Sequence, residues 1–205
     1  MHRKACEDLI QRRADYNTLE IGAGSLNHLE YEPSSKHYEI VEPFEALYAG
    51  STYRSRIEKI YGDLSEVQDK RYDRIISIAT FEHLCNLPSV VASCGMLLAP
   101  NGQLRVGIPS EGTILWGLGW RLTTGIEFRL SRGLNYGVLM RHEHVNTSAE
   151  VAKVLEYFFK STRRSVFGIS PSLSFYQFFE CAGPDVARCT AYLRETEEGS
   201  FDLIR

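Results

Sequence analysis

The chain has 205 residues, of which 43% are hydrophobic and 24% are charged, as is usual for one soluble globular domain. Its formal net charge of −3 argues against a general electrostatic attraction to nucleic acid. No apolar run is long enough to span a membrane, and we expect no secretory signal because no apolar core follows Met1.

The first half of the chain alternates short apolar segments with helix-like segments. Strands are expected at 18–21, 37–41, 57–61, 72–78 and 103–108, and helices at 4–13, 44–51 and 86–98. Pro33 limits the brief helix after the first strand, and Pro100-Asn101-Gly102 is expected to end the third helix. This alternation predicts a doubly wound, mostly parallel α/β sheet.

Residues 112–140 interrupt the pattern with Gly, Trp, Leu and Arg and contain no clear strand. A helix is expected at 148–159, with Thr147 or Asn146 as its N-cap and Glu150 near the capping-box position. The remaining expected elements are strands 162–169 and 174–180, helix 186–195 and a polar, frayed tail after Glu197. We therefore expect a single domain, 1–205, in which residues 111–145 form an insertion.

The carboxyl ends of parallel strands meet at one edge of a sheet, where open α/β proteins bind their ligands. Five residues stand at these expected ends: Gly22, Glu42, Asp63, Ala79 and Pro109. Their loops should therefore converge on one crevice. Gly22 and Gly24 add backbone freedom there and let a ligand come up against the main chain.

Six short motifs are informative as a set. They are Leu19-Glu20-Ile21-Gly22-Ala23-Gly24, Glu42 after the second strand, Gly62-Asp63-Leu64, Tyr72-Asp73-Arg74-Ile75-Ile76-Ser77, Phe81-Glu82-His83-Leu84 and Leu97-Leu98-Ala99-Pro100-Asn101-Gly102. Together they resemble the class I S-adenosylmethionine-dependent methyltransferases, most closely the small-molecule and glycan-type, methyltransferase type 11-like members. The resemblance implies a Rossmann-like, seven-stranded and mostly parallel sheet with an antiparallel terminal strand.

The resemblance also implies S-adenosylmethionine as the cofactor. That molecule offers a methionine carboxylate and amine, a ribose diol and an adenine, but no phosphate. Glu42 can accept both ribose hydroxyls and Asp63 the adenine amine, while Leu64 or a neighbour covers the ring. The expected cofactor-binding residues are Glu20, Gly22, Ala23, Gly24, Glu42, Pro43, Asp63, Leu64, Ala79 and Thr80.

Methyl transfer is an in-line attack on an activated methyl group, so alignment supplies much of the acceleration. An oxygen acceptor gains further from a base near neutral pH, and histidine is the natural candidate. The expected catalytic residues are His83, His142 and His144. For His83, the alternative is a residue that only caps or orients the adjacent helix. The His142-Glu143-His144 segment could equally be a metal pair, a base with its orienting group, or surface polarity.

We expect no bound metal. Some related ubiquinone-pathway O-methyltransferases use several acidic residues after the fourth strand for a divalent ion, whereas Ala79 and Thr80 are not acids here. The five cysteines are odd in number and lack Cys-x-x-Cys spacing, which argues against a disulfide framework or a thiolate zinc site. This cysteine usage indicates a reducing cytoplasm.

The insertion 111–145 is the expected cap on the acceptor side of the crevice. Its expected substrate-binding residues are Trp116, Trp120, Arg121 and Arg129, which could stack on a sugar or aromatic ring and pair with a phosphate or carboxylate. The same composition also suits a local subdomain, a membrane-surface contact or a homodimer interface. An Asp-Pro-Pro-Tyr-like tetrapeptide is missing after the fourth strand, so a nucleic-acid substrate is not expected.

The sequence therefore predicts a methyltransferase that acts on a small-molecule or glycan-type acceptor, with oxygen as the expected atom. One alternative is an NAD(P)-dependent Rossmann oxidoreductase, but Asn27 stands where the third glycine of its fingerprint would fall. The other alternative is a non-catalytic partner subunit that binds the cofactor or nothing.

Overall fold

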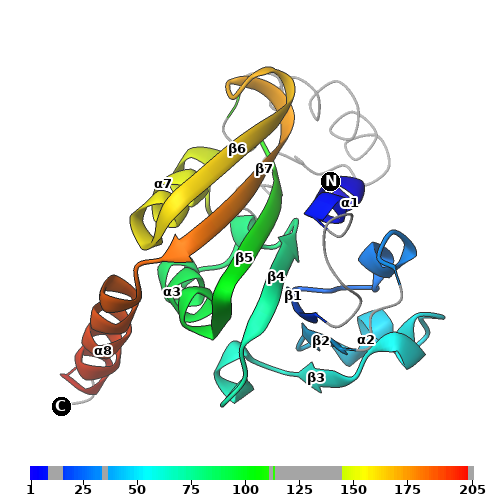
Figure 1. The fold of residues 1–205 in the computed structure, drawn as a ribbon, viewed down its shortest axis with the longest axis horizontal. Coiled ribbons are helices and arrows are strands. Elements are labelled where there is room, and N and C mark those ends of the chain that lie inside the picture. The colour runs from blue at the N-terminus through cyan, green and yellow to red at the C-terminus, as the bar shows by residue number, and fades with distance from the viewer. Residues whose placement is uncertain (9–15, 34–36, 111–112, 114–144, 203–205) are drawn as a thin grey trace, which may run out of the picture.

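A computed structural model of the protein describes residues 1–8, 16–33, 37–110, 113 and 145–202 (Figure 1). Within these residues, seven strands form one sheet in the order β3-β2-β1-β4-β5-β7-β6. The strands are β1 (Asn17–Ile21), β2 (His37–Val41), β3 (Lys59–Tyr61), β4 (Tyr72–Ile78), β5 (Leu98–Pro109), β6 (Phe159–Ser170) and β7 (Leu173–Pro184). Neighbours are parallel except that β7 runs antiparallel to both β5 and β6, which confirms the predicted fold class.

The helices of the described residues are α1 (His2–Ala5), α2 (Glu45–Tyr48), α3 (Leu87–Leu97), α7 (Ser148–Phe158) and α8 (Val186–Asp202), with 3₁₀ turns η2 (Asn27–Glu30), η3 (Arg54–Arg56), η4 (Leu64–Glu66) and η5 (Phe81–His83). Among them, α1 and α2 have four residues each, whereas α3, α7 and α8 have eleven or more. No helix in the described ranges is long and apolar enough to cross a membrane.

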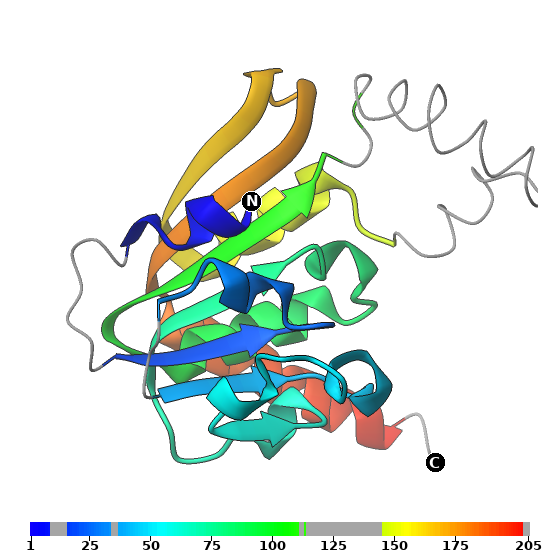
Figure 2. The same cartoon turned by 90° about the vertical axis from the view of Figure 1, so that its right-hand side faces the viewer.

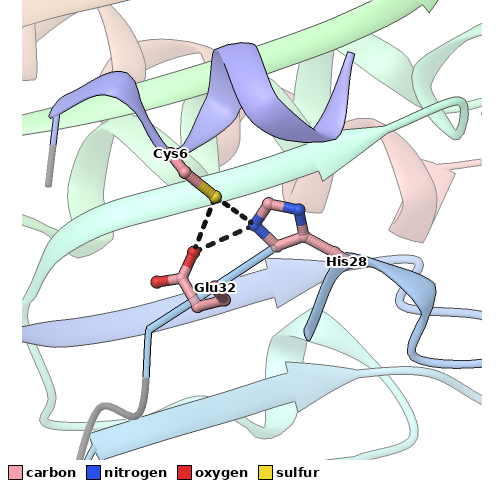
Figure 3. Close-up of side chains that lie close together, drawn as sticks. All are labelled: Cys6, His28 and Glu32. Carbon is pink, nitrogen blue, oxygen red and sulfur yellow. Dashed lines mark hydrogen bonds and ion pairs between the residues drawn. The ribbon is translucent and has the colours of Figure 1, made fainter. Parts of the chain in front are cut away.

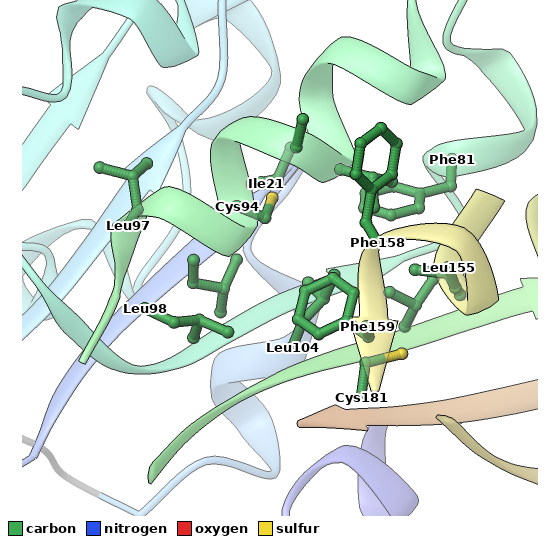
Figure 4. Packing of buried hydrophobic residues seen from close by; sticks show 14 of the residues in the cluster. Ile21, Phe81, Cys94, Leu97, Leu98, Leu104, Leu155, Phe158, Phe159 and Cys181 are labelled. Atoms are coloured by element: carbon green, nitrogen blue, oxygen red, sulfur yellow. The ribbon is translucent and has the colours of Figure 1, made fainter. Parts of the chain in front are cut away.

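One face of the sheet packs against α3, α7 and α8 and forms the main hydrophobic core. Leu155 and Phe158 of α7 and Cys94 of α3 meet Leu104 and Cys181 of the sheet there, and each of these side chains is at most 1% exposed (Figure 4). Burial of apolar area on this scale is the main source of stability, at roughly 1.5–3 kcal/mol for each fully buried aliphatic or aromatic side chain.

The opposite face carries buried charge where an apolar surface would be usual. Arg74 of β4 and Arg105 of β5 are both 0% exposed. Their guanidinium groups donate to the carbonyl oxygen of Ala5, Arg74 Nη2 at 3.0 Å and Arg105 Nε at 3.1 Å, and Arg105 Nη2 also donates to the carbonyl of Lys4 at 2.9 Å. These bonds hold α1 across the middle of the sheet (Figure 2).

Carboxylates compensate both arginines. Arg74 lies 2.8 Å from Asp8 and 2.5 Å from Glu32, and Arg105 lies 2.9 Å from Glu180. These ion pairs offset the free-energy cost of removing the buried charges from water. The expected helix at 4–13 is observed only as α1, which ends at Ala5, and residues 9–13 fall outside the described part of the chain.

Several expected boundaries are wrong, most clearly those of β5 and α8. Strand β5 begins at Leu98 and includes Pro100-Asn101-Gly102, because the register shifts opposite Tyr72 and Asn101 takes a left-handed φ of 66°. Helix α8 continues beyond Glu195 to Asp202. By contrast, the capping box is confirmed: Thr147 Oγ1 accepts from the Glu150 amide, and Glu150 Oε2 accepts from the Thr147 amide at 2.7 Å.

Candidate active site

A cleft of about 430 Å³ lies at the carboxyl ends of β1 to β4. Eight of the expected cofactor-binding residues line it: Gly22, Gly24, Glu42, Pro43, Asp63, Leu64, Ala79 and Thr80. They come from four loops that are far apart in the sequence, and the parallel strand order brings those loops together. The volume falls in the range of roughly 300–1,000 Å³ that is usual for small-molecule sites.

The turn after β1 requires glycine at two positions. Gly22 has a φ of +71°, and a Cβ built on it would lie 2.3 Å from Thr80 Oγ1. Gly24 has a φ of +52°, and a Cβ there would meet no described atom within 4 Å. Gly22 therefore allows the loops after β1 and β4 to touch, whereas Gly24 leaves bare main chain beside open space in the cleft.

Glu42 links this glycine turn to the loop after β2. Its side chain is only 5% exposed, and its two oxygens accept from the amides of Gly24 at 2.8 Å and Phe44 at 3.0 Å. A carboxylate offers about four acceptor positions, so each oxygen retains one for a ligand. The two bonds orient the carboxylate before any ligand binds.

Asp63 stands at the end of β3 and is the N-cap of η4. Its Oδ1 accepts from the Ser65 hydroxyl at 2.6 Å and the Ser65 amide at 2.8 Å. These two hydrogen bonds, the hydroxyl first, lower the pKa of Asp63. Oδ2 has no hydrogen-bond partner among the residues described, so the exposed carboxylate can cap the turn and still accept from a ligand.

Glu20 and Ala23, also expected at the cofactor, do not line the cleft. Ala23 packs with Leu26 and Leu29 in a small core beneath the loop. Glu20 points into the charged face of the sheet, where it is 2% exposed and its Oε2 accepts from the Tyr38 hydroxyl at 2.8 Å. Burial raises the pKa of Glu20 to about 7.

This buried carboxyl makes stability depend on pH. Because its pKa rises from 4.5 to about 7 on folding, the native protein holds a proton that the unfolded chain releases between those values. The free energy of unfolding should therefore fall as pH rises through that window. Glu20→Gln has no titrating group at this position. Relative to the wild type, its free energy of unfolding in urea should therefore rise by about 3 kcal/mol between about pH 4 and about pH 8.

The matched control for this measurement is Glu45→Gln, on an exposed position of α2. That variant should change the free energy of unfolding little at either pH. Parallel pH curves for Glu20→Gln and the wild type would contradict the assignment of a shifted carboxyl to Glu20.

His83 lies in η5 after β4 and lines the same cleft. Its side chain is 40% exposed, and Nε2 lies 3.9 Å from Oε1 of Glu82, whose side chain is 2% exposed. Ala79, just before this turn, holds a left-handed φ of +54° that is costly for a residue with a Cβ. The loop after β4 is thus held in a strained shape that places His83 at the cleft.

Residues 145–146 fix this turn from outside. The amides of Val145 and Asn146 both donate to the Glu82 carbonyl, at 2.9 and 3.0 Å, and Asn146 Nδ2 donates to the carbonyls of Phe81 and Leu84. The chain therefore passes beside His83 directly after residue 144.

The remaining expected site residues lie outside the part of the chain that the structure describes: His142, His144, Trp116, Trp120, Arg121 and Arg129. The residues flanking them are described. Thr113 Oγ1 donates to the Ser174 carbonyl at 3.3 Å near the end of β5, and Val145 lies beside η5. Both flanks of the insertion therefore lie at the sheet edge that carries the cleft.

Two apolar residues of the cleft were not expected at the site. Phe44 and Leu47, from the start of α2, are 67% and 51% exposed and line the cleft with Leu64. Exposed apolar side chains that line a cleft suit the face of a flat ring. Phe44 and Leu47 stand three residues apart shortly after Glu42, the acidic residue that follows β2, and this pattern could have indicated them.

The strand order, the antiparallel β7, the glycine turn after β1 and the carboxylate after β2 define the class I methyltransferase fold. No model of a known protein family matches the sequence, and no curated protein matches it significantly. Solved structures do match. A Thermotoga maritima S-adenosylmethionine-dependent methyltransferase, named as a possible histamine N-methyltransferase, is 14% identical with a TM-score of 0.60 over 88% of both chains.

Two further similar structures carry other names. The carbon methyltransferase CurJ is 19% identical with a TM-score of 0.61, over 88% of this chain and 53% of that one. An O-methyltransferase family protein from Burkholderia thailandensis is 14% identical with a TM-score of 0.59, over 89% of this chain and 55% of that one. This chain thus spans about half the length of these two, and the shared feature is the fold.

Proposed function

We propose that this protein is an S-adenosylmethionine-dependent methyltransferase that acts on a small-molecule or glycan-type acceptor, with oxygen as the methylated atom. The observation that carries the proposal is Glu42, a nearly buried carboxylate tied to the amide of Gly24 at 2.8 Å at the edge of the cleft. A carboxylate beside exposed main chain suits a ligand with a diol, because the carboxylate can accept from both hydroxyls while the rest of the ligand lies against the backbone.

The residues of the cleft fit the cofactor's parts. Glu42 would hold the ribose hydroxyls, and the main chain of the Gly22–Gly24 turn would accommodate the methionine portion. Asp63 would accept from the adenine amine, with Phe44 and Leu47 against the ring. When bound, S-adenosylmethionine supplies a methyl group already activated on a sulfonium.

His83 is the proposed base for the acceptor hydroxyl. Its imidazole lines the cleft and is 40% exposed, so a ring nitrogen could accept the proton of an acceptor hydroxyl bound there. The assignment of oxygen rests on this histidine, because the similar folds carry N-, C- and O-methyltransferase names.

The insertion 111–145 is the proposed acceptor cap, with Trp116, Trp120, Arg121, Arg129, His142 and His144 as candidate contacts. The position of its flanks supports this role, since Thr113 and Val145 both lie at the edge with the cleft. A panel of sugar, phenol and carboxylate acceptors, assayed by release of S-adenosylhomocysteine, would identify the substrate class.

A thermal shift measurement separates this function from its alternatives. S-adenosylhomocysteine at about 100 times its dissociation constant should stabilise the protein by about 2.7 kcal/mol, or roughly 5–10 °C in Tm, whereas NADH should have no effect. Stabilisation by NADH alone would favour the oxidoreductase. No shift with either ligand at millimolar concentration would favour a non-catalytic partner subunit.

A further inference from the structure

A second cluster of reactive side chains lies on the charged face of the sheet, apart from the residues that line the cleft. Cys6 follows α1, whereas His28 and Glu32 stand four residues apart in and after η2 (Figure 3). His28 and Glu32 are 1% and 3% exposed, and Cys6 is half-buried. Among the described residues, this is the one group of three potential metal ligands whose donor atoms all lie within 4.8 Å of one another.

We propose that Cys6, His28 and Glu32 form a binding site for a zinc ion. The donor atoms are Cys6 Sγ, His28 Nε2 and Glu32 Oε2, and all three point toward one another (Figure 3). A thiolate, an imidazole and a carboxylate are the three ligand types that zinc takes in proteins. The proposal goes beyond methyl transfer and does not depend on it.

The distances between the donors match the edges of a tetrahedron around zinc. Sγ lies 3.8 Å from Nε2 and 3.4 Å from Oε2, and Nε2 lies 3.1 Å from Oε2. Tetrahedral bonds of usual length to sulfur, nitrogen and oxygen would place these atoms about 3.3–3.6 Å apart. Small side-chain adjustments would therefore bring all three to coordination distance, with solvent at the fourth position.

The neighbouring groups leave the correct atoms available and orient them. Arg74 Nη1 donates to Glu32 Oε1 at 2.5 Å, while Arg74 Nη2 reaches Oε2 only at 3.5 Å. Oε2 lies closer to His28 Nε2, at 3.1 Å, and 3.4 Å from Cys6 Sγ. The other His28 nitrogen, Nδ1, lies 3.3 Å from His2 Nδ1, and such a contact fixes the orientation of a ligating ring.

The charges of the region sum to zero with a dication present. Arg74, Arg105 and the ion carry four positive charges, and Asp8, Glu32, Glu180 and a Cys6 thiolate carry four negative ones, with Glu32 shared between Arg74 and the ion. The half-buried Cys6 thiol lies 3.4 Å from Glu32 Oε2. Binding forms the Zn–S bond and releases the thiol proton to solvent.

Bound zinc would connect two segments that otherwise meet only through hydrogen bonds and packing. Cys6 belongs to the N-terminal segment that covers the charged face, whereas His28 follows directly after the glycine turn of the cleft. These ligands are scattered in the sequence and include one cysteine, which is why the spacing of cysteines did not indicate them.

Cobalt titration of the chelator-treated full-length protein tests the site, because tetrahedral Co²⁺ replaces zinc and reports a thiolate ligand by charge-transfer absorption. We expect saturation at about one Co²⁺ per chain, displacement by Zn²⁺ and complete loss of the charge-transfer band in Cys6→Ser. The matched control is Cys85→Ser, at an exposed cysteine, which should retain the band. These measurements need no methyl donor, so their outcome is independent of the outcome of the methyltransferase assays.

Alkylation of the wild-type protein keeps the test decisive if Cys6→Ser fails to fold. Mass spectrometry of tryptic peptides should show Zn²⁺ protecting Cys6 from iodoacetamide by tenfold or more, while Cys85 reacts equally with and without the metal. No cobalt binding by the folded protein would overturn the proposal. So would a charge-transfer band that persists in folded Cys6→Ser, or equal labelling of Cys6 in both states.

Discussion

Replacing His83 by alanine is expected to lower kcat by about 100-fold or more while changing the affinity for S-adenosylhomocysteine by less than about threefold, since general-base catalysis typically contributes 10²–10⁴. The imidazole lies at the edge of the cleft and is oriented by a turn whose carbonyls accept from Val145 and Asn146. Its removal would leave the acceptor hydroxyl without a proton acceptor but would not alter the glycine turn or Glu42.

The measurement is steady-state turnover with the best acceptor of the panel, together with calorimetric binding of S-adenosylhomocysteine. His37→Ala is the matched control, because His37 is exposed, pairs with Glu58 and stands at the opposite end of β2 from the cleft. His142→Ala is also expected to reduce turnover more than affinity. Unchanged kcat in both His83→Ala and His142→Ala would remove the two histidines from the mechanism.

Glu42→Gln is expected to weaken the binding of S-adenosylhomocysteine by about 10- to 100-fold. The carboxylate accepts from Gly24 and Phe44 with separate oxygens, whereas an amide has one acceptor oxygen and turns its NH₂ group toward one of those amides. The variant therefore loses charge-assisted hydrogen bonds to the ribose and strains the turn. A loss of about 1.5–3 kcal/mol corresponds to that range of affinity.

Calorimetry of wild type and variant measures this loss directly, and circular dichroism verifies that the variant remains folded. Glu45→Gln, three residues away on an exposed position of α2, should bind as tightly as the wild type. Equal affinities for Glu42→Gln and the wild type would separate Glu42 from the cofactor and withdraw the main support for the proposed function.

The sheet could be predicted from the sequence because its signals are local. The segments around Leu19, Ile40 and Ile75 are apolar and end in turn residues, and the alternation of strands with helices then dictates parallel pairing. From that pairing, Gly22 and Glu42 must fall at the same edge. Eight of ten expected cofactor-binding residues accordingly line one cleft.

What could not be predicted depends on partners distant in the sequence. Pro100-Asn101-Gly102 has the composition of a turn, yet it continues β5 because Tyr72 pairs with Leu98 across a register shift. Arg74 and Arg105 place charges within otherwise apolar strands, and only the folded sheet reveals the carboxylates that compensate them. A local pattern contains no information on such contacts.

The attachment of α1 has a consequence for the order in which the molecule forms. A four-residue helix has no stability of its own. Its anchoring bonds join the Ala5 carbonyl to Arg74, 69 residues away, and to Arg105, 100 residues away. Residues so far apart in the sequence lose chain entropy when they are brought together, before their contact stabilises the fold. Such contacts therefore slow folding. The bonds that anchor α1 to the centre of the sheet can therefore form only after β5 has been synthesised.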